Sequence, residues 1–276
     1  MKNINIYIVL IAILFLSCEK VVDIDVPSIE PKLIIDASFE VMFDELPVTA
    51  NTIVKLKLSA DYFDETIPTV SNATVFLTNL SDNTIIPFSD LNNNGDFTPL
   101  SSFIPEDNRV YELTVIHENE TYKGKATKVK STTIENVIQG DETLFSDDET
   151  EVKVAFKDNI EEENYYLFDF TNKLFTALED RFFNGTDYNF SFFYDEEEIE
   201  LPTNVTVRMS GITQDYFTYF RILQNQSGSG GGGPFESVPS SLLGNIINTT
   251  NEKNFPLGYF HISETDTFDV QLEEKN

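Results

Sequence analysis

Apolar and polar residues alternate in short stretches through the first half of the chain, and a period of two predicts β-strands. Residues 52–60 place Val54, Leu56 and Leu58 on one face, with lysines between them on the other. Further strands are predicted at 73–80, 110–117 and 121–128. Short strands with turn signals about every ten residues are typical of a β-sandwich. We therefore predict that residues 30–133 form an immunoglobulin- or fibronectin-like β-sandwich.

The second half is also rich in predicted strands, and in one stretch of it the period of the apolar residues changes. Strands are predicted at 152–156, 165–170, 203–210, 258–263 and 266–273. In residues 215–226, four side chains instead share one stripe at helical spacing: Tyr216, Tyr219, Phe220 and Leu223. Thr213 is a suitable N-cap, and a Gly- and Ser-rich loop follows at 227–233. Residues 134–276 are therefore predicted to form a second β-rich domain with one short helix, so the fold class is mainly β.

The first residues differ from the rest because they are apolar without alternation. A short basic start leads into an apolar run at 4–16, about half to two-thirds of the length that a membrane-spanning helix needs. Such a run is typical of an export signal. It ends at Ser17 and Cys18, the only cysteine in the chain. A small residue directly before a cysteine resembles a bacterial lipoprotein processing site, where the exposed cysteine receives acyl chains such as palmitate.

Residues 1–17 are therefore predicted to be a lipoprotein signal peptide, Cys18 the lipid attachment site, and residues 18–29 a lipidated tether. Several acyl chains on one residue would anchor the protein firmly, whereas a single chain gives only marginal membrane binding. An ordinary signal peptide with an incidental cysteine is the alternative. We expect the mature protein in the outer membrane, on its cell-surface or its periplasmic face.

Composition narrows the function further. The 276 residues include 18 Lys and Arg against 47 Asp and Glu, which gives a formal net charge of −29. This excludes nucleic-acid binding, which requires a surplus of basic residues, and it makes contact with anionic lipid repulsive. The single cysteine allows no internal disulfide, and two histidines leave little material for catalysis. Because no nucleophile-elbow motif lies at a strand-to-helix turn, we predict that the protein is not an enzyme and uses no cofactor.

One loop has the spacing of a calcium ligand set. Asp90, Asn92, Asn94 and Asp96 place oxygen atoms at alternate positions around a glycine. The twelfth position holds Ser101 instead of the glutamate of an EF-hand, and no helical pattern flanks the loop. A hairpin turn explains the same residues and is preferred, so no metal site is predicted and calcium is kept as the alternative.

Runs of carboxylates lie at 147–149, 161–163 and 195–198. Adjacent like charges are usually solvated turns, and cation binding is the alternative. We expect a partner surface that meets these runs to be basic, or the contact to be bridged by cations, because like charges repel. The Gly- and Ser-rich loop is interpreted as a mobile loop rather than a phosphate cradle, because no Lys-Ser or Lys-Thr pair follows it.

The segment 234–260 follows this loop, and its Pro234-Phe235 pair would display an apolar side chain at the end of the loop. We therefore propose Phe235, Asn245, Tyr259 and Phe260 as a candidate partner or ligand surface. The alternative is that Phe235 and Phe260 fill the core of the second domain.

Several pieces of the sequence resemble one family. They are residues 111–115 with 122–126, Asn164-Tyr165-Tyr166, the Tyr-rich helix, and the run from Pro234-Phe235 through Gly244-Asn245-Ile246 to Leu257-Gly258-Tyr259-Phe260. Together with Ser17-Cys18, they resemble Bacteroidota outer-membrane lipoproteins catalogued as domain of unknown function 4249, over nearly the whole chain. Members often have a proline after the second of these strands, where this chain has Lys128-Val129-Lys130, so the hinge between the domains is expected to differ.

Members of that family are typically encoded beside TonB-dependent outer-membrane receptors, and the family implies no catalytic residues. The resemblance implies a lipid-anchored accessory protein of a TonB-dependent transporter or another outer-membrane complex. Such a protein would dock on the receptor, or on another outer-membrane barrel protein, or capture the ligand. A structural or adhesive surface lipoprotein that binds glycan or protein is the alternative.

Overall fold

The computed structural model describes residues 30–274, except for 62, 63, 65, 161, 196 and 228–241. The predicted signal peptide, Cys18, the tether, Phe235 and all but the first residue of the Gly-rich loop lie outside the described residues. The chain from Pro31 onward forms one compact unit. Within its described part, no helix is both long and apolar enough to cross a membrane.

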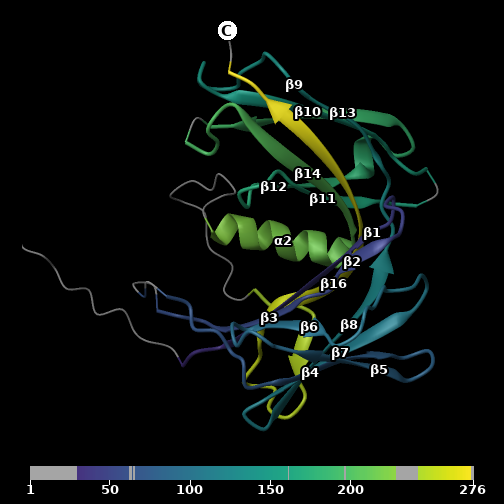
Figure 1. The fold of residues 1–276 in the computed structure, drawn as a ribbon, viewed down its shortest axis with the longest axis vertical. Helices are drawn as coiled ribbons and strands as arrows, with labels where there is room; N and C mark the ends of the chain where they lie inside the picture. The colour runs from purple at the N-terminus through teal and green to yellow at the C-terminus, as the bar shows by residue number, and fades with distance from the viewer. Residues whose placement is uncertain are drawn as a thin grey trace, which may run out of the picture. The chain divides into compact units, whose positions relative to one another are not determined.

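The strands before residue 130 belong to one large mixed sheet (Figure 1). They are β1 (Leu33–Met42), β2 (Thr49–Asn51), β3 (Val54–Leu58), β4 (Thr74–Asn79), β5 (Thr84–Ser89), β6 (Asp96–Pro99), β7 (Val110–His117) and β8 (Glu120–Val129). Their order in space is β1-β3-β6-β5-β4-β7-β8, with β2 beside β1, and all these neighbours are antiparallel. Burial alternates along β1, as the period of two requires.

One long strand carries this sheet into the second half of the chain. The remaining strands of the sheet are β11 (Tyr165–Asp169), β12 (Phe175–Glu179), β14 (Thr203–Ile212), β15 (Ile246–Asn248) and β16 (Leu257–Leu272). The first half of β16 runs parallel to β1, and its second half runs antiparallel to β14. Beyond β14 the sheet continues through β11 to β12, while β15 pairs with β8. Because β16 pairs in both halves, it joins them in one sheet.

A second sheet and a helix complete the described fold. The sheet has the order β13-β10-β9, formed by β9 (Ile134–Gln139), β10 (Thr150–Lys157) and β13 (Asp187–Tyr194). A 3-10 turn, η1 (Asp180–Phe182), precedes β13, and the helix α2 (Gln214–Gln226) follows β14 directly. Figure 1 shows α2 beside β11 and β12, against which its aromatic residues pack.

Three clusters of buried side chains hold these layers together. The first core takes its residues from β1 to β8, but it also includes Ile246, Phe260 and Ile262 from the C-terminal strands. The second core lies between the three-stranded sheet and the sheet formed by β11, β14 and β16. A third, smaller cluster lies under α2. The division into two domains stays a prediction, because nothing in these contacts tests a boundary near residue 133.

The mainly β class with one α-helix in the described residues is confirmed, and two details differ from the sequence analysis. The helix begins at Gln214, where the Thr213 side chain caps it by accepting a hydrogen bond from the Tyr216 N–H (3.1 Å). The strands predicted at 258–263 and 266–273 are one strand, so the predicted break is wrong. Glu264 lies within the predicted break, and its carboxylate is nearly buried against Lys128 (3.1 Å) and the Ser131 N–H (3.2 Å), so the strand continues through it.

Candidate functional site

The Asn245 side chain forms hydrogen bonds with the backbone of two strands. Its side chain accepts a hydrogen bond from the Phe260 N–H (2.8 Å) and donates to the Phe260 carbonyl (2.7 Å). It also donates to the Lys125 carbonyl (3.1 Å). One side-chain amide therefore joins the segment before β15 to both β8 and β16.

Phe260 does not lie on a surface, so that part of the predicted partner surface is corrected. Its side chain is 0% exposed and belongs to the first core, where its ring meets Phe39 edge to face with centroids 5.4 Å apart. The reason is the alternation along β16, which turns Phe260 to one face of the sheet and Tyr259 to the other. Phe260 therefore fills a core, although it is the first core rather than the second.

Tyr259 lies in a group of rings that we call the tyrosine cluster: Tyr216, Tyr219, Tyr259 and His261. The first two stand three residues apart on α2, and the last two stand two residues apart on β16, so each pair shares one face. Tyr259 lies 4.8 Å from Tyr216 and 4.9 Å from Tyr219 between ring centroids. His261 stacks on Tyr216 at 4.1 Å. The cluster therefore joins α2 to β16, in addition to the contacts that the helix makes with β11 and β12.

Burial sets the protonation of the tyrosine cluster. It lowers the pKa of His261 to about 4, and the ring Nδ1 lies 3.0 Å from the Ser263 hydroxyl. Burial, with the nearby charge of Asp36, raises the pKa of Tyr216 and of Tyr219. At neutral pH the imidazole is uncharged and both phenols keep their protons. The cluster therefore offers hydrogen bonds and ring faces rather than charge.

The loop proposed as a calcium alternative is organised as a turn. The Asp90 carboxylate accepts hydrogen bonds from the N–H groups of Asn92 (3.1 Å), Asn94 (3.2 Å) and Gly95 (2.8 Å). Burial would raise the pKa of Asp90, but hydrogen bonds from Ser71 and from these backbone groups outweigh it and lower the pKa. Gly95 has φ +85°, and a Cβ there would lie 2.6 Å from the Leu56 carbonyl oxygen. The geometry fits the turn.

The titratable side chains of the described residues do not gather into a metal-binding cluster. No group of three or more His, Cys, Asp or Glu side chains that could hold a metal ion occurs among the described residues. The Asn94 side-chain amide donates a hydrogen bond to the Asp96 carboxylate (3.1 Å), so these two side chains of the loop bond to one another.

The carboxylate run at 147–149 is not entirely a solvated turn. Glu149 is buried and accepts hydrogen bonds from the N–H groups of Leu144 and Phe145. Nearby Glu151, also buried, accepts from the Ser191 hydroxyl (2.5 Å) and lies 3.4 Å from the Lys153 ammonium. These two carboxylates shape the loop between β9 and β10. Of the other runs, Glu161 and Glu196 lie outside the described residues.

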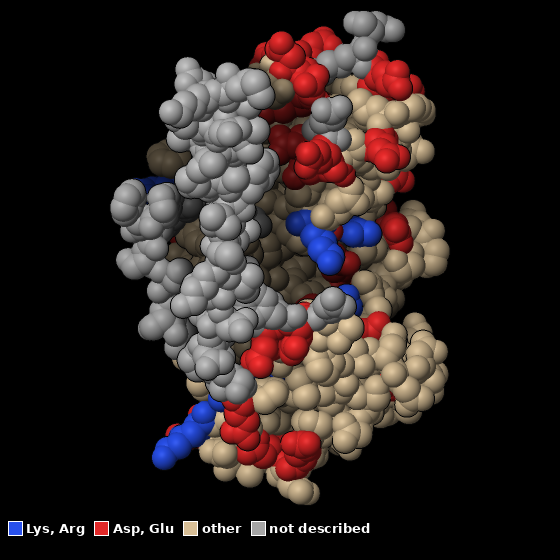
Figure 2. All heavy atoms as spheres, turned by 90° about the vertical axis from the view of Figure 1, so that its left-hand side faces the viewer, with Lys and Arg blue, Asp and Glu red and all other residues tan. Residues whose placement is uncertain are grey.

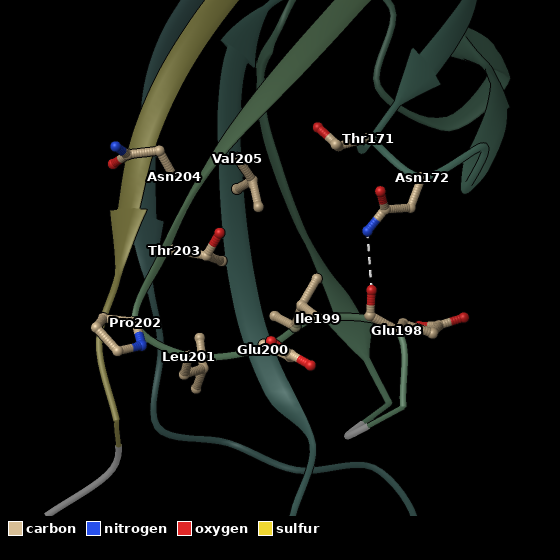
Figure 3. A pocket seen from close by; sticks show the side chains of 10 residues that line it. All are labelled: Thr171, Asn172, Glu198, Ile199, Glu200, Leu201, Pro202, Thr203, Asn204 and Val205. Atoms are coloured by element: carbon tan, nitrogen blue, oxygen red, sulfur yellow. Dashed lines mark hydrogen bonds between the residues drawn. The ribbon is translucent and has the colours of Figure 1, made fainter.

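One hollow of about 420 Å³ is lined by both polar and apolar residues of the second half (Figure 3). It lies between Thr171, Asn172 and the segment 198–205. The Asn172 amide donates to the Glu198 carbonyl (2.8 Å), as the dashed line in Figure 3 marks. Thr171 has a positive φ of 69°, and its hydroxyl both donates to the Thr206 carbonyl (2.9 Å) and accepts from its N–H (3.2 Å). The strained turn is therefore held by bonds to the edge of β14.

A larger hollow of about 620 Å³ lies beside β2, and the sequence analysis missed it. We call it the β2 hollow; it is lined by residues 47–53, Thr98, Pro99 and 102–104. Most of its side chains are apolar, and Leu46 and Leu100 next to it are 97% and 62% exposed. The signal in the sequence was a set of apolar residues outside the predicted strands. Such a group on a surface commonly marks an interaction site.

Charge is distributed unevenly over the face in Figure 2. Asp and Glu side chains lie over its upper and lower parts, whereas Lys and Arg gather mainly in one small group near the middle. The excess of acidic residues in the sequence is therefore visible on this face as well.

Comparison with known proteins identifies the family. A search of curated proteins finds no match. A family model described as Domain of unknown function (DUF4249) matches residues 19–269, well over half of the chain and nearly all of the part from which the described fold is built. The chain with the tyrosine cluster and the β2 hollow therefore belongs to the DUF4249 family.

Proposed function

We propose that the protein is a lipid-anchored, non-enzymatic accessory protein of an outer-membrane complex. It acts by binding a partner protein, and a TonB-dependent receptor or another outer-membrane barrel protein is the partner that the family resemblance favours. The observation that carries the proposal is the β2 hollow, where apolar side chains are exposed on a strongly acidic chain. Exposed apolar surface of this kind favours contact with protein.

Anchoring through Cys18 suits this role. The described unit begins about 12 residues after Cys18, and an extended chain of that length reaches about 40 Å. A protein on such a tether would stay close to the membrane while its surfaces remain accessible to a neighbour. Its net charge of −29 keeps it away from anionic lipid and attracts a basic partner surface.

The tethering is tested by Cys18→Ala, with Ser17→Ala as the matched control because it keeps a small residue before the cysteine. We expect Cys18→Ala to abolish acyl labelling and release the protein from the outer membrane, while Ser17→Ala retains both. Equal membrane retention of all three proteins, with no acyl label on any, would contradict the lipid anchor.

The partnership is tested by purifying the tagged protein in mild detergent at low and high salt. A stoichiometric barrel-sized partner that is lost as salt rises would support docking through charge and apolar contact. Retention that is lost on chelation instead would indicate bridging by cations. Purification of the protein without any stoichiometric partner, at low and high salt and with or without a chelator, would contradict the accessory role.

The second candidate is a structural or adhesive surface lipoprotein that binds glycan. The hollow at Thr171, Asn172 and 198–205 favours it, because hydroxyl, amide and carboxylate groups gather there (Figure 3). Glycan-array binding that Asn172→Ala abolishes would support this candidate over the first.

A further inference from the structure

Among the strands that the structure describes, β2 has a pairing partner on one edge only. It pairs with the second half of β1, at Val41↔Ala50 and the residues on either side, while β3 pairs with the first half. Next to β3 lies β6, paired at Val54↔Phe97 and Lys55↔Asp96. Among the described strands, none pairs with the outer edge of β2 as β6 pairs with β3. The outer edge of β2 therefore lacks the neighbour that β3 has.

The neighbour is missing because β6 turns toward β5. Its last residues pair with β5 at Ser89↔Thr98 and Phe88↔Pro99. The next N–H group, that of Leu100, donates to the Pro87 carbonyl (3.0 Å) and so also bonds on the β5 side. The β2 hollow, lined by β2 and by residues on both sides of this turn, occupies the place that a longer β6 would have filled.

An added strand would find apolar contacts in this place. Ala50 and Phe103 line the hollow and pack against the first core, and the Phe103 ring meets Tyr111 edge to face at 5.5 Å. Ile104 is 40% exposed and lines the hollow as well. Because successive side chains of a strand face opposite ways, every second residue of an inserted segment would face these apolar groups.

Exposed edges are usually guarded by charged side chains, by proline or by shortness of the strand. β2 is short, and Pro47 lies just before it. However, Val48, which lines the hollow, is exposed and apolar, and so are Leu46 and Leu100, which directly adjoin lining residues in the sequence. Exposed apolar side chains favour pairing with another segment, whereas charged side chains at the same place would prevent it.

The charges near the hollow define the occupant. Asp44 and Glu45 lie three and two residues before the first lining residue, Pro47, and Glu106 and Asp107 lie two and three residues after the last, Ile104. Asp107 is paired with Lys128 (2.6 Å) and Glu106 with Arg109 (3.3 Å), so the uncompensated negative charge lies mainly at the Asp44 end. An incoming segment with basic residues beside its apolar ones would be attracted there.

From this geometry we propose that the β2 hollow accepts an extended segment of a partner protein as an added β-strand, with apolar residues at alternate positions and basic residues at its ends. Main-chain hydrogen bonds to the free edge of β2 provide affinity, and the apolar floor selects the side chains. The proposal deepens the proposed function, on which it rests for the partner being a protein. A second copy of this acidic chain would be repelled, and residues 18–29 would bring Asp23 and Asp25 to an acidic end.

The test uses the purified full chain with the Cys18→Ala substitution. Two fluorescent peptides are added to it in separate titrations. The probe is Lys-Val-Thr-Val-Thr-Val-Lys, and in the control peptide the central Val is Pro, which removes one N–H and disfavours strand pairing. We expect saturable binding of the probe by fluorescence anisotropy and at least about tenfold weaker binding of the proline peptide. Binding of the probe should also weaken as salt rises.

Two variants place a positive charge in the hollow, and a third places it on another short edge strand. Ala50→Arg and Ile104→Arg should each weaken probe binding about tenfold or more, because they fill the hollow and repel the basic ends. Ile247→Arg, on the exposed face of β15, adds the same charge elsewhere and should change binding less than about threefold. Ile104 lies in a loop, so its variant tests the hollow even if Ala50→Arg fails to fold.

Four binding results, and one result on the oligomeric state, would each overturn the proposal. The binding results are no saturable binding below about 1 mM, equal affinity for the proline peptide, equal weakening by Ile247→Arg, and tighter binding after deletion of residues 19–29. The last would show that the chain's own segment is the occupant, and a dimer lost in Ala50→Arg on light scattering would show a second copy instead. No membrane or receptor is used, so failure here is distinct from failure of the lipid anchor or of copurification.

Discussion

The two large cores meet along β16 but are built differently. The first is made mainly of Val, Leu and Ile from alternating strands, with aromatic rings such as Phe39 and Phe88 among them. The second also has Val, Ile and Leu, but it contains a continuous group of rings, in which Phe170 stacks on Phe192 at 4.0 Å and Phe183 on Tyr188 at 3.9 Å. The second core lies between two sheets, whereas the first opens at the β2 hollow.

This difference teaches where to look for function in a fold of this kind. In the second half, buried carboxylates such as Glu149 and Glu151 and the strained Thr171 are bonded to nearby parts of the chain. In the first half, β2 keeps an edge without a strand beside apolar side chains. Strand edges and exposed apolar side chains occur in the second half as well, at β12 and Phe182 for example, but only in the first half does a strand edge coincide with a hollow lined mostly by apolar residues, which makes this place the candidate interface.

The largest expected effect tests whether the two cores are separate. Phe260→Ala in the first core and Phe170→Ala in the second should each lower the free energy of unfolding by about 3–5 kcal/mol, because both side chains are fully buried. Since β16 belongs to both halves, we expect one transition in urea for each variant, with fluorescence and circular dichroism coinciding.

Phe182→Ala is the matched control, because this ring is 88% exposed and should contribute less than about 0.5 kcal/mol. Two separated transitions in either core variant would show that the cores unfold independently, and the comparison would then be one between two domains.

The next effect concerns the place where α2 meets β16. Burial holds the folded pKa of His261 at about 4, below the ordinary value of 6.5, so the unfolded chain binds the proton more readily. Its contribution to stability is therefore complete above pH 6.5 and is lost as the pH falls toward 4. Between pH 7 and 4.5 we expect the wild type to lose about 2 kcal/mol more than His261→Phe.

The measurement is urea unfolding at several pH values. His261→Phe keeps a ring against Tyr216 but leaves the Ser263 hydroxyl without its partner, so a constant offset in stability is expected. Only the difference in pH dependence tests the prediction. Identical pH profiles for the two proteins would show that His261 is not shielded from solvent.

The smallest effect concerns how α2 begins. Thr213→Ala removes the hydroxyl that accepts from the Tyr216 N–H, and we expect a loss of about 1 kcal/mol in urea unfolding. Thr218→Ala is the control, because its exposed hydroxyl only bonds back to the Gln214 carbonyl within the helix. An equal effect of both variants would mean that helix propensity, rather than the cap, is being measured.

Local patterns predicted much of the fold. The stripe of Tyr216, Tyr219 and Phe220 predicted α2, and Thr213 marked its start, because capping and helical spacing involve residues close in sequence. The strand β13 could have been predicted in the same way, since Tyr188, Phe190, Phe192 and Tyr194 occupy every second position. Its alternation lies beside an acidic run that suggested a turn.

The candidate site could not be predicted in this way, because it depends on distant residues. In Leu257-Gly258-Tyr259-Phe260-His261, both faces of the strand are covered, so apolar character does not distinguish the core side from the side facing α2. The β2 hollow arises only because β6 pairs with β5 beyond Phe97. No local pattern in residues 49–51 shows that the neighbouring strand leaves.

The parallel pairing of β1 with β16 has a consequence for how the protein is made. The first core needs Phe260 and Ile262, so the strands synthesised first cannot complete their packing until residues 257–265 have emerged. Contacts between such distant segments form slowly, because a long loop must close before any of them is gained. The order of synthesis is therefore not the order of packing, and the first strands stay without a complete core until the last strand of the chain is available.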